Sequence, residues 1–265
     1  MQERPHLSVH IEKTAGVSLR EFYQRIYGSE MVFTYYPATD TLLRTSEESF
    51  PRTNKLINSL KLALAQTPFL PLLARFNVSR SHRALNHIPV TELSSVGSFR
   101  VIHGHFLANR FDNILPDSFM SIVLRDPMER MASQFLHWRR TEGHALFRTI
   151  VPYDPKVIFT EFAFFAPLQN YQTAALAGKN LTDFDLVGTT EKIDLFAQTL
   201  VRKLKINQFS LTSLLRLNTC PRDCDKNGLG ITNEFTERFK VFHRVDYENY
   251  ALAETLAQEA YQRAI

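Results

Sequence analysis

The feature of this sequence that most constrains its fold is a strand, a helix and a second strand that follow one another near the start of the chain. His6–Ile11 is rich in apolar and β-branched residues, as strands are. Ser18–Tyr27 places apolar side chains at the spacing of a helix, and Met31–Tyr36 again has the composition of a strand. Two strands joined by one helix over so short a span lie parallel in the same sheet. The pattern therefore predicts an α/β fold, with a central parallel sheet flanked by helices.

The rest of the chain extends this arrangement. Further strands are expected at Phe99–Ile102, Phe119–Leu124 and Phe184–Gly188, and further helices at Met128–Arg140 (begun by Pro127), Lys192–Leu204 and Asp246–Ala264. Prolines interrupt residues from about 39 to 96, which are expected to form an insertion of short helices and loops. No linker divides the chain, so residues 1–265 are expected to form a single domain.

Composition narrows the class of ligand. A chain of 265 residues that is 44% hydrophobic and 22% charged is an ordinary globular protein that can bury a core. Its formal net charge of +4 suits a site for a small polyanion, and no Lys- or Arg-rich run supports binding to nucleic acid. No run approaches the ~20 apolar residues of a membrane span, and the N-terminus lacks the pattern of a signal segment. A cytoplasmic location is therefore expected, with a luminal catalytic domain lacking its anchor as the alternative.

The loop between the first strand and the first helix is a candidate phosphate site. A parallel sheet binds ligands beyond the carboxyl ends of its strands, and a helix N-terminus offers unpaired N–H groups to an anion. Here Lys13 supplies a full charge, Gly16 allows close approach of the backbone, and Thr14 and Ser18 carry hydroxyl donors. Because Lys13 precedes the glycine, the loop differs from that of ordinary ATPases and GTPases. The alternative is a solvated lysine in a glycine-containing turn.

Two histidines follow the third expected strand. His103 and His105 project from the same face if the strand continues through them, and histidine has a pKa suited to a general base near neutral pH. The alternatives are a structural or acceptor-binding role and metal binding. A metal would need a third ligand from elsewhere in the chain. Cys220 and Cys224, the only cysteines, lack further ligands at zinc-site spacing. No metal is therefore expected, and the two cysteines are expected to be free thiols or, alternatively, a local disulfide.

Two segments of the chain resemble the motifs of the carbohydrate sulfotransferases. The first is His10–Leu19, which is similar to the opening motif of that family. The resemblance implies that this loop, from Lys13 through Thr14, Ala15, Gly16, Val17 and Ser18 to Leu19, holds the 5′-phosphosulfate of 3′-phosphoadenosine 5′-phosphosulfate (PAPS). Two positions depart from the family pattern. Glu12 stands where proline is usual, and Val17 stands where a hydroxyl residue is common.

The second segment is Ser121–Phe135, a strand followed by Arg-Asp-Pro and a helix. The resemblance implies that Arg125 and Ser133 hold the 3′-phosphate, which distinguishes PAPS from ATP. Arg130 is expected to be structural, with an acidic neighbour such as Asp126 as its partner. The His103-Gly104-His105 sequence resembles the uronic-acid 2-O-sulfotransferase branch, where such histidines act as the base and position the acceptor.

Three later segments are similar to family stretches in the expected order: Asn170–Gly178, Val187–Asp194 (near the nucleotide in the family) and Asp246–Tyr250. Ala174 stands where arginine is frequent, so one acceptor contact of the family is missing. Taken together, the resemblance implies a P-loop NTPase-like sulfotransferase fold and an enzyme that uses PAPS without a metal. Such an enzyme moves a sulfuryl group to a hydroxyl of a carbohydrate or related acceptor, with Lys13 neutralising the bridging oxygen. The alternatives are a non-catalytic module that binds PAPS or its product, and a kinase-like phosphotransferase.

Overall fold

The computed structural model describes residues 4–35, 99–142, 153–206 and 226–264. The insertion expected at about residues 39–96 lies outside the described residues, as do Cys220 and Cys224. The predictions for these segments therefore remain predictions.

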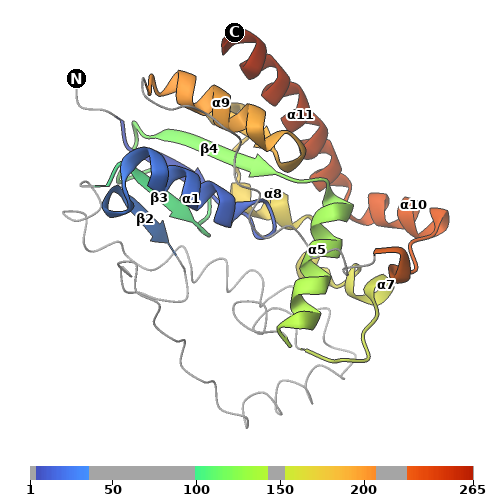
Figure 1. The fold of residues 1–265 in the computed structure, drawn as a ribbon. Helices are drawn as coiled ribbons and strands as arrows, with labels where there is room; N and C mark the ends of the chain where they lie inside the picture. The colour runs from blue at the N-terminus through green and yellow to red at the C-terminus, as the bar shows by residue number, and fades with distance from the viewer. Residues whose placement is uncertain (1–3, 36–98, 143–152, 207–225, 265) are drawn as a thin grey trace.

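The described part of the chain contains a five-stranded sheet with the order β2-β3-β1-β4-β5, in which every neighbouring pair is parallel. The strands are β1 His6–Val9, β2 Val32–Tyr35, β3 Val101–Gly104, β4 Phe119–Leu124 and β5 Leu186–Thr189 (Figure 1). In the register of the central strands, His6 lies opposite Val101 on one side and Phe119 on the other. The predicted parallel α/β sheet is thus confirmed, and β4 has the predicted bounds.

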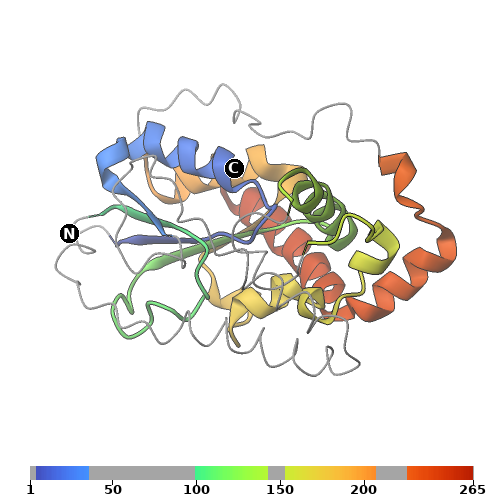
Figure 2. The same ribbon diagram turned by 90° about the horizontal axis from the view of Figure 1, so that it is seen from below.

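Helices cover both faces of this sheet. The longer ones are α1 Gly16–Tyr27, α5 Pro127–Arg140, α9 Ile193–Lys203, α10 Asn233–Phe242 and α11 Arg244–Ala264, and the shorter ones are α7 Phe159–Phe162 and α8 Tyr171–Leu176. Single 3₁₀ turns occupy Ser29–Met31, Ala166–Leu168, Leu181–Asp183, Thr190–Lys192 and Lys226–Leu229. Figure 2 shows α1 and α9 on one face and α8 on the other.

Alternate residues of each strand enter different cores, because successive side chains of a strand point to opposite faces. Val101 and Val123 pack with Leu19 of α1 and Leu200 of α9, whereas their neighbours on the strands pack toward α8 and α11. A third, aromatic core around Trp138 joins α5, α7 and α10 beyond the end of the sheet. Burial on both faces is the pattern of a parallel sheet, and it explains why the strands read as nearly continuous apolar runs.

None of the helices in the described part of the chain is both long enough and apolar enough to cross a membrane.

Candidate functional site

The strand order places two loops at the position where open α/β sheets bind ligands. From β1 the chain runs to β2 at one edge of the sheet, and from β4 it runs to β5 at the other edge, although β1 and β4 are neighbours. The loops that leave β1 and β4 therefore diverge, and such a divergence opens a crevice at the carboxyl ends of the strands. Lys13 lies in the first of these loops and Arg125 directly follows β4.

The backbone of the first loop leaves N–H groups at the start of α1 without an acceptor. Lys13 and Ala15 both have left-handed backbone angles, with φ of 70° and 65°. Ala15 caps α1 without any side-chain hydrogen bond. No acceptor among the described residues pairs with the N–H groups of Gly16 and Val17. Unpaired N–H groups at the positive end of a helix dipole favour a phosphate or sulfate group.

The side chains of the loop contribute unequally. The hydroxyl of Thr14 donates to the carbonyl of Ile11 at 2.8 Å, so it holds the turn together. Leu19 has no group left for a ligand, because its N–H donates to the carbonyl of Ala15 at 3.0 Å and its side chain lies in the core under α1. The structure therefore gives no support to the prediction that Leu19 binds the donor. Ser18 is buried in the first turn of α1.

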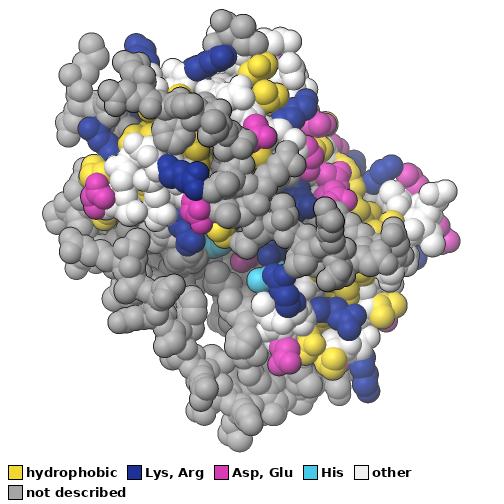
Figure 3. Space-filling view, viewed as in Figure 1, with side chains coloured by type: hydrophobic (Ala, Val, Ile, Leu, Met, Phe, Trp, Pro, Cys, Tyr) yellow, Lys and Arg dark blue, Asp and Glu magenta, His cyan; other side chains and the backbone are white. Residues whose placement is uncertain are grey.

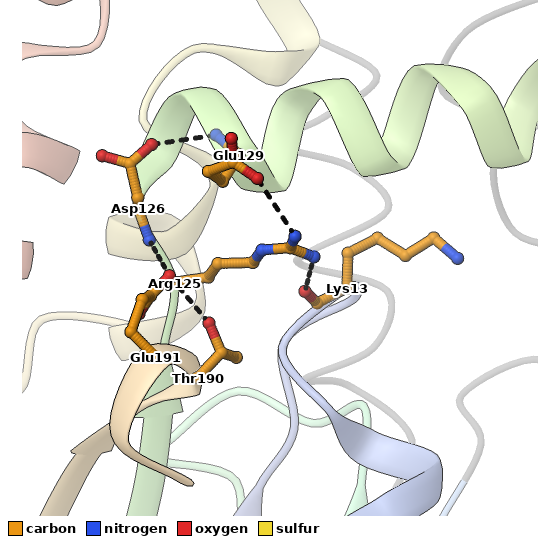
Figure 4. Close-up of polar contacts among 6 residues, drawn as sticks. All are labelled: Lys13, Arg125, Asp126, Glu129, Thr190 and Glu191. Atoms are coloured by element: carbon orange, nitrogen blue, oxygen red, sulfur yellow. Dashed lines mark hydrogen bonds and ion pairs between the residues drawn. The ribbon is translucent and has the colours of Figure 1, made fainter. Parts of the chain in front are cut away.

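Lys13 and Arg125 meet beyond the carboxyl ends of β1 and β4 (Figure 4). The guanidinium of Arg125 donates to the main-chain carbonyl of Lys13 at 3.3 Å and forms an ion pair with Glu129 at 3.4 Å. Burial, reinforced by the charges of Arg140 and Arg125, lowers the pKa of Lys13 to about 8, whereas the charge of Glu12 opposes this shift. Burial disfavours the charged form of Lys13 whatever surrounds it, whereas the part of the shift due to Arg140 and Arg125 is a repulsion between like charges that an anionic ligand would relieve.

Ser133 lies on α5, one turn beyond Glu129 and one turn before His137. Because residues four apart share a helix face, Ser133 faces the same side as these two residues. Arg125 reaches Glu129, and the charge of Lys13 helps to lower the pKa of His137 to about 4, after burial as the larger cause. Ser133 is half-buried on this face of α5.

Three histidine rings stack behind the loop. The ring of His10 lies 5.2 Å from that of His103 and 4.3 Å from that of His105, measured between centroids. A Cβ atom added to Gly16 would overlap the ring of His10. The glycine is therefore required by this packing as well as by any ligand, a reason that the sequence did not reveal. The sequence predicts only that His10 is a strand residue, but β1 ends at Val9 and His10 lies directly after it.

The structure gives the two candidate bases different environments. His103 is 2% exposed, and both of its ring nitrogens are used: Nδ1 bonds with the hydroxyl of Ser8 at 2.9 Å and Nε2 with the carbonyl of Gly16 at 3.1 Å. Since a carbonyl can only accept, Nε2 carries the proton. Burial is the main cause that lowers the pKa of His103 to about 3. These contacts favour a structural role for His103.

His105 is only partly buried, and its Nδ1 lies 3.1 Å from the carbonyl of His10. Because a carbonyl can only accept, this contact places the proton on Nδ1 and leaves the lone pair of the neutral ring on Nε2, the atom that would accept a proton. Burial lowers the pKa of His105, while Glu12 acts to raise it. Of the two histidines, His105 therefore has the better geometry for accepting a proton.

The carboxyl end of β4 is fixed by Gln172, which sequence reasoning placed only in a supporting segment. Its fully buried side chain accepts from the N–H of Arg125 at 2.9 Å and donates to the carbonyl of Arg125 at 2.8 Å. Asp246 in turn accepts from the N–H groups of Gln172 and Thr173 at the start of α8. Two of the three supporting segments thus hold the backbone of Arg125 in place.

The third supporting segment also reaches this site. The carboxylate of Glu191 accepts from the hydroxyl of Thr190 at 3.0 Å and from the N–H of Asp126 at 3.4 Å (Figure 4). Figure 3 shows histidine, basic and acidic side chains reaching the surface together near the centre of the face seen in Figure 1.

The predicted pairing of Arg130 with Asp126 is wrong. The carboxylate of Asp126 caps α5 by accepting from the N–H of Glu129 at 2.9 Å. Arg130 is buried, and its guanidinium lies over the ring of Tyr171 at 4.9 Å. The Asp126 carboxylate therefore acts as the N-cap of α5, and Arg130 packs against Tyr171 instead.

Within residues 4–35, 99–142, 153–206 and 226–264, no three or more His, Cys, Asp or Glu side chains are placed to hold a metal ion. Comparison of the chain with known protein families and with curated proteins finds no match. The functional argument therefore depends on the geometry of the site itself.

Proposed function

We propose that this protein transfers a sulfuryl group from PAPS to a hydroxyl, with a carbohydrate or related molecule as acceptor. The observation that carries the proposal is the contact between Arg125 and Lys13, because it joins two separate anion sites at the point where the sheet diverges. One site is the uncapped start of α1 with Lys13, and the other is Arg125 with Ser133 nearby. A ligand that fills both carries two separated anionic groups, as PAPS does.

The residues present fit this donor. Backbone N–H groups of Gly16 and Val17 and the ammonium of Lys13 would bind the 5′-phosphosulfate. The ion pair of Arg125 with Glu129 is long, and the carboxylate is 43% exposed, so it contributes little and can be exchanged for a phosphate. A guanidinium can bind a phosphate through two parallel hydrogen bonds, and the hydroxyl of Ser133 would add a third.

The chain's own groups supply the proton transfer. In the proposed reaction the acceptor oxygen forms a bond to sulfur while the bond from sulfur to the phosphate oxygen breaks. The hydroxyl proton moves to Nε2 of His105, whose Nδ1 is held by the carbonyl of His10. Lys13 stabilises the negative charge that develops on the departing phosphate oxygen.

The direct test is transfer of labelled sulfate from PAPS across a panel of glycans and simple alcohols, read by mass spectrometry. Wild-type protein is expected to label at least one acceptor class, and Lys13→Ala and His105→Ala are each expected to lose turnover. PAP, the desulfated product, should still bind to His105→Ala.

Two other functions would give different results. Binding of PAP without transfer to any acceptor would favour a non-catalytic module. Transfer of phosphate from ATP would favour a kinase-like phosphotransferase.

A further inference from the structure

Glu12 is a charged residue of the loop between β1 and α1 (residues 10–15, the phosphate loop) that the proposed donor site does not use. A carboxylate beside an anion site opposes binding of a negatively charged ligand, so its presence calls for a physical reason. The hydroxyl of Tyr171 donates to this carboxylate at 3.1 Å. Tyr171 is the first residue of α8, which lies on the face of the sheet opposite to α1. The bond therefore ties the phosphate loop to a helix that is distant along the chain.

The residue that follows Tyr171 holds the second anion site. The side chain of Gln172 bonds to the N–H of Arg125 at 2.9 Å and to its carbonyl at 2.8 Å. Two successive residues of α8 thus contact the two loops that leave β1 and β4. These loops also touch directly, because the guanidinium of Arg125 donates to the carbonyl of Lys13 at 3.3 Å. Glu12 and Arg125 are therefore both bonded to the same turn of helix.

This first turn of α8 is itself fixed by two other helices. Asp246, which is 2% exposed near the start of α11, accepts from the N–H groups of Gln172 and Thr173 at 3.2 and 2.8 Å. It also accepts from the hydroxyl of Thr173 at 2.7 Å. The ring of Tyr171 packs against the guanidinium of Arg130 on α5, 4.9 Å from its centroid. A turn held in this way can serve as a rigid support for the loops that bond to it.

We infer that the hydrogen bond from Tyr171 to Glu12 holds the phosphate loop in its observed shape, so that one turn of α8 positions this loop and Arg125 together. The inference rests on the proposed function only for the identity of the ligand. The loop needs support because Lys13 and Ala15 have left-handed backbone angles, which non-glycine residues keep only when their surroundings enforce them. A loop that is ordered in advance avoids an entropy cost when the ligand binds, and this gain offsets the repulsion by the carboxylate.

Calorimetry with PAP in a double-mutant cycle tests whether Tyr171 acts through Glu12. Tyr171→Phe keeps the ring against Arg130 and removes only the hydroxyl. PAP is expected to bind about three- to tenfold more weakly to this variant, an effect of the size of one hydrogen bond. In a Glu12→Ala background the same change should alter the dissociation constant by less than about twofold, because the acceptor of the bond is already gone. Tyr261→Phe, near the C-terminal end of α11, is the matched control and should bind PAP as wild type does.

Hydrogen exchange followed by NMR tests the same bond without any ligand. The N–H of Thr14 donates to the carbonyl of Ile11 at 3.3 Å, so its exchange rate reports on the shape of the phosphate loop. This rate is expected to rise about three- to tenfold in Tyr171→Phe. The amides of β4 should keep their wild-type rates, and they serve as the internal control for global unfolding.

Equal weakening of PAP binding by Tyr171→Phe in both backgrounds would overturn the inference, as would an unchanged exchange rate of Thr14. An equal rise of the exchange rates in β4 would also overturn it, because Tyr171 would then stabilise only the fold as a whole. If wild-type protein does not bind PAP but exchange of Thr14 alone rises in Tyr171→Phe, the proposed function fails while the support of the loop by α8 stands.

Discussion

Replacement of Gln172 by methionine tests how the site is held together. Methionine is similar in length and is apolar, so the substitution removes both hydrogen bonds to the backbone of Arg125, at 2.9 and 2.8 Å, without opening a large cavity. Each polar group left without a partner costs about 1–3 kcal/mol, and these two are only partly buried. We therefore expect the free energy of unfolding to fall by about 2–3 kcal/mol.

Urea denaturation measures this change, and Gln134→Met is its matched control. Gln134 is equally buried on α5, but its Oε1 has no hydrogen-bond partner among the described residues. Its replacement should change stability by less than about 1 kcal/mol. Gln172→Met should also weaken binding of PAP by calorimetry, because Arg125 loses its anchor. Equal stability losses in the two variants would refute the claim that Gln172 holds the backbone of Arg125 in place. Unchanged PAP affinity in Gln172→Met would refute it as well.

Four further predictions concern the buried histidines. His103→Ala should lower the free energy of unfolding by about 2–4 kcal/mol, because it leaves two partners unsatisfied. His105→Ala should change the free energy of unfolding by less than about 1 kcal/mol yet cut turnover at least about 100-fold. Similar stability losses in His103→Ala and His105→Ala would contradict the assignment of His103 as structural and His105 as the base. Gly16→Ala should cost about 1–3 kcal/mol, because the new methyl group overlaps the ring of His10; a fully stable variant would show that the ring can move. Burial lowers the pKa values of His6 and His103 to about 3 in the folded protein, so the unfolded chain binds more protons below about pH 6.5. The contribution of these two histidines to stability should thus be constant above that pH and fall as the pH drops toward 3, by about 1.4 kcal/mol per pH unit for each histidine. Urea midpoints between about pH 7.5 and 5 measure this, and a flat profile would contradict the neutral burial of these rings.

The fold was largely predictable because the signals that specify it are local. Strands buried on both faces are short apolar runs, and Asp126-Pro127 at the start of α5 is a recognisable helix beginning. Helix and strand ends shifted by a few residues, as at β3, which begins at Val101 instead of Phe99. The strand order required the structure, since local periodicity does not specify which strands become neighbours.

The candidate site was predictable only in part. Lys13 was indicated by its place between a strand end and a helix start, and Arg125 by the resemblance of Ser121–Phe135 to a family motif. The sequence did not separate His103 from His105, whose difference depends on partners in β1 and in the loop. The contacts of Gln172, Tyr171 and Glu12 join segments far apart in sequence, so no spacing rule could find them. The prediction for Arg130 failed for the same reason, since its contact, Tyr171, is distant along the chain.

The central claim is that the site holds one ligand with separate 5′- and 3′-phosphate groups. Calorimetry with PAP and with AMP, which lacks the 3′-phosphate, tests it directly in wild type and in Arg125→Ala. We predict that wild type binds PAP at least about tenfold more tightly than AMP, the equivalent of one charged hydrogen bond, and that Arg125→Ala removes this preference. Equal affinities for PAP and AMP in wild type, or a preference that survives in Arg125→Ala, would contradict the account.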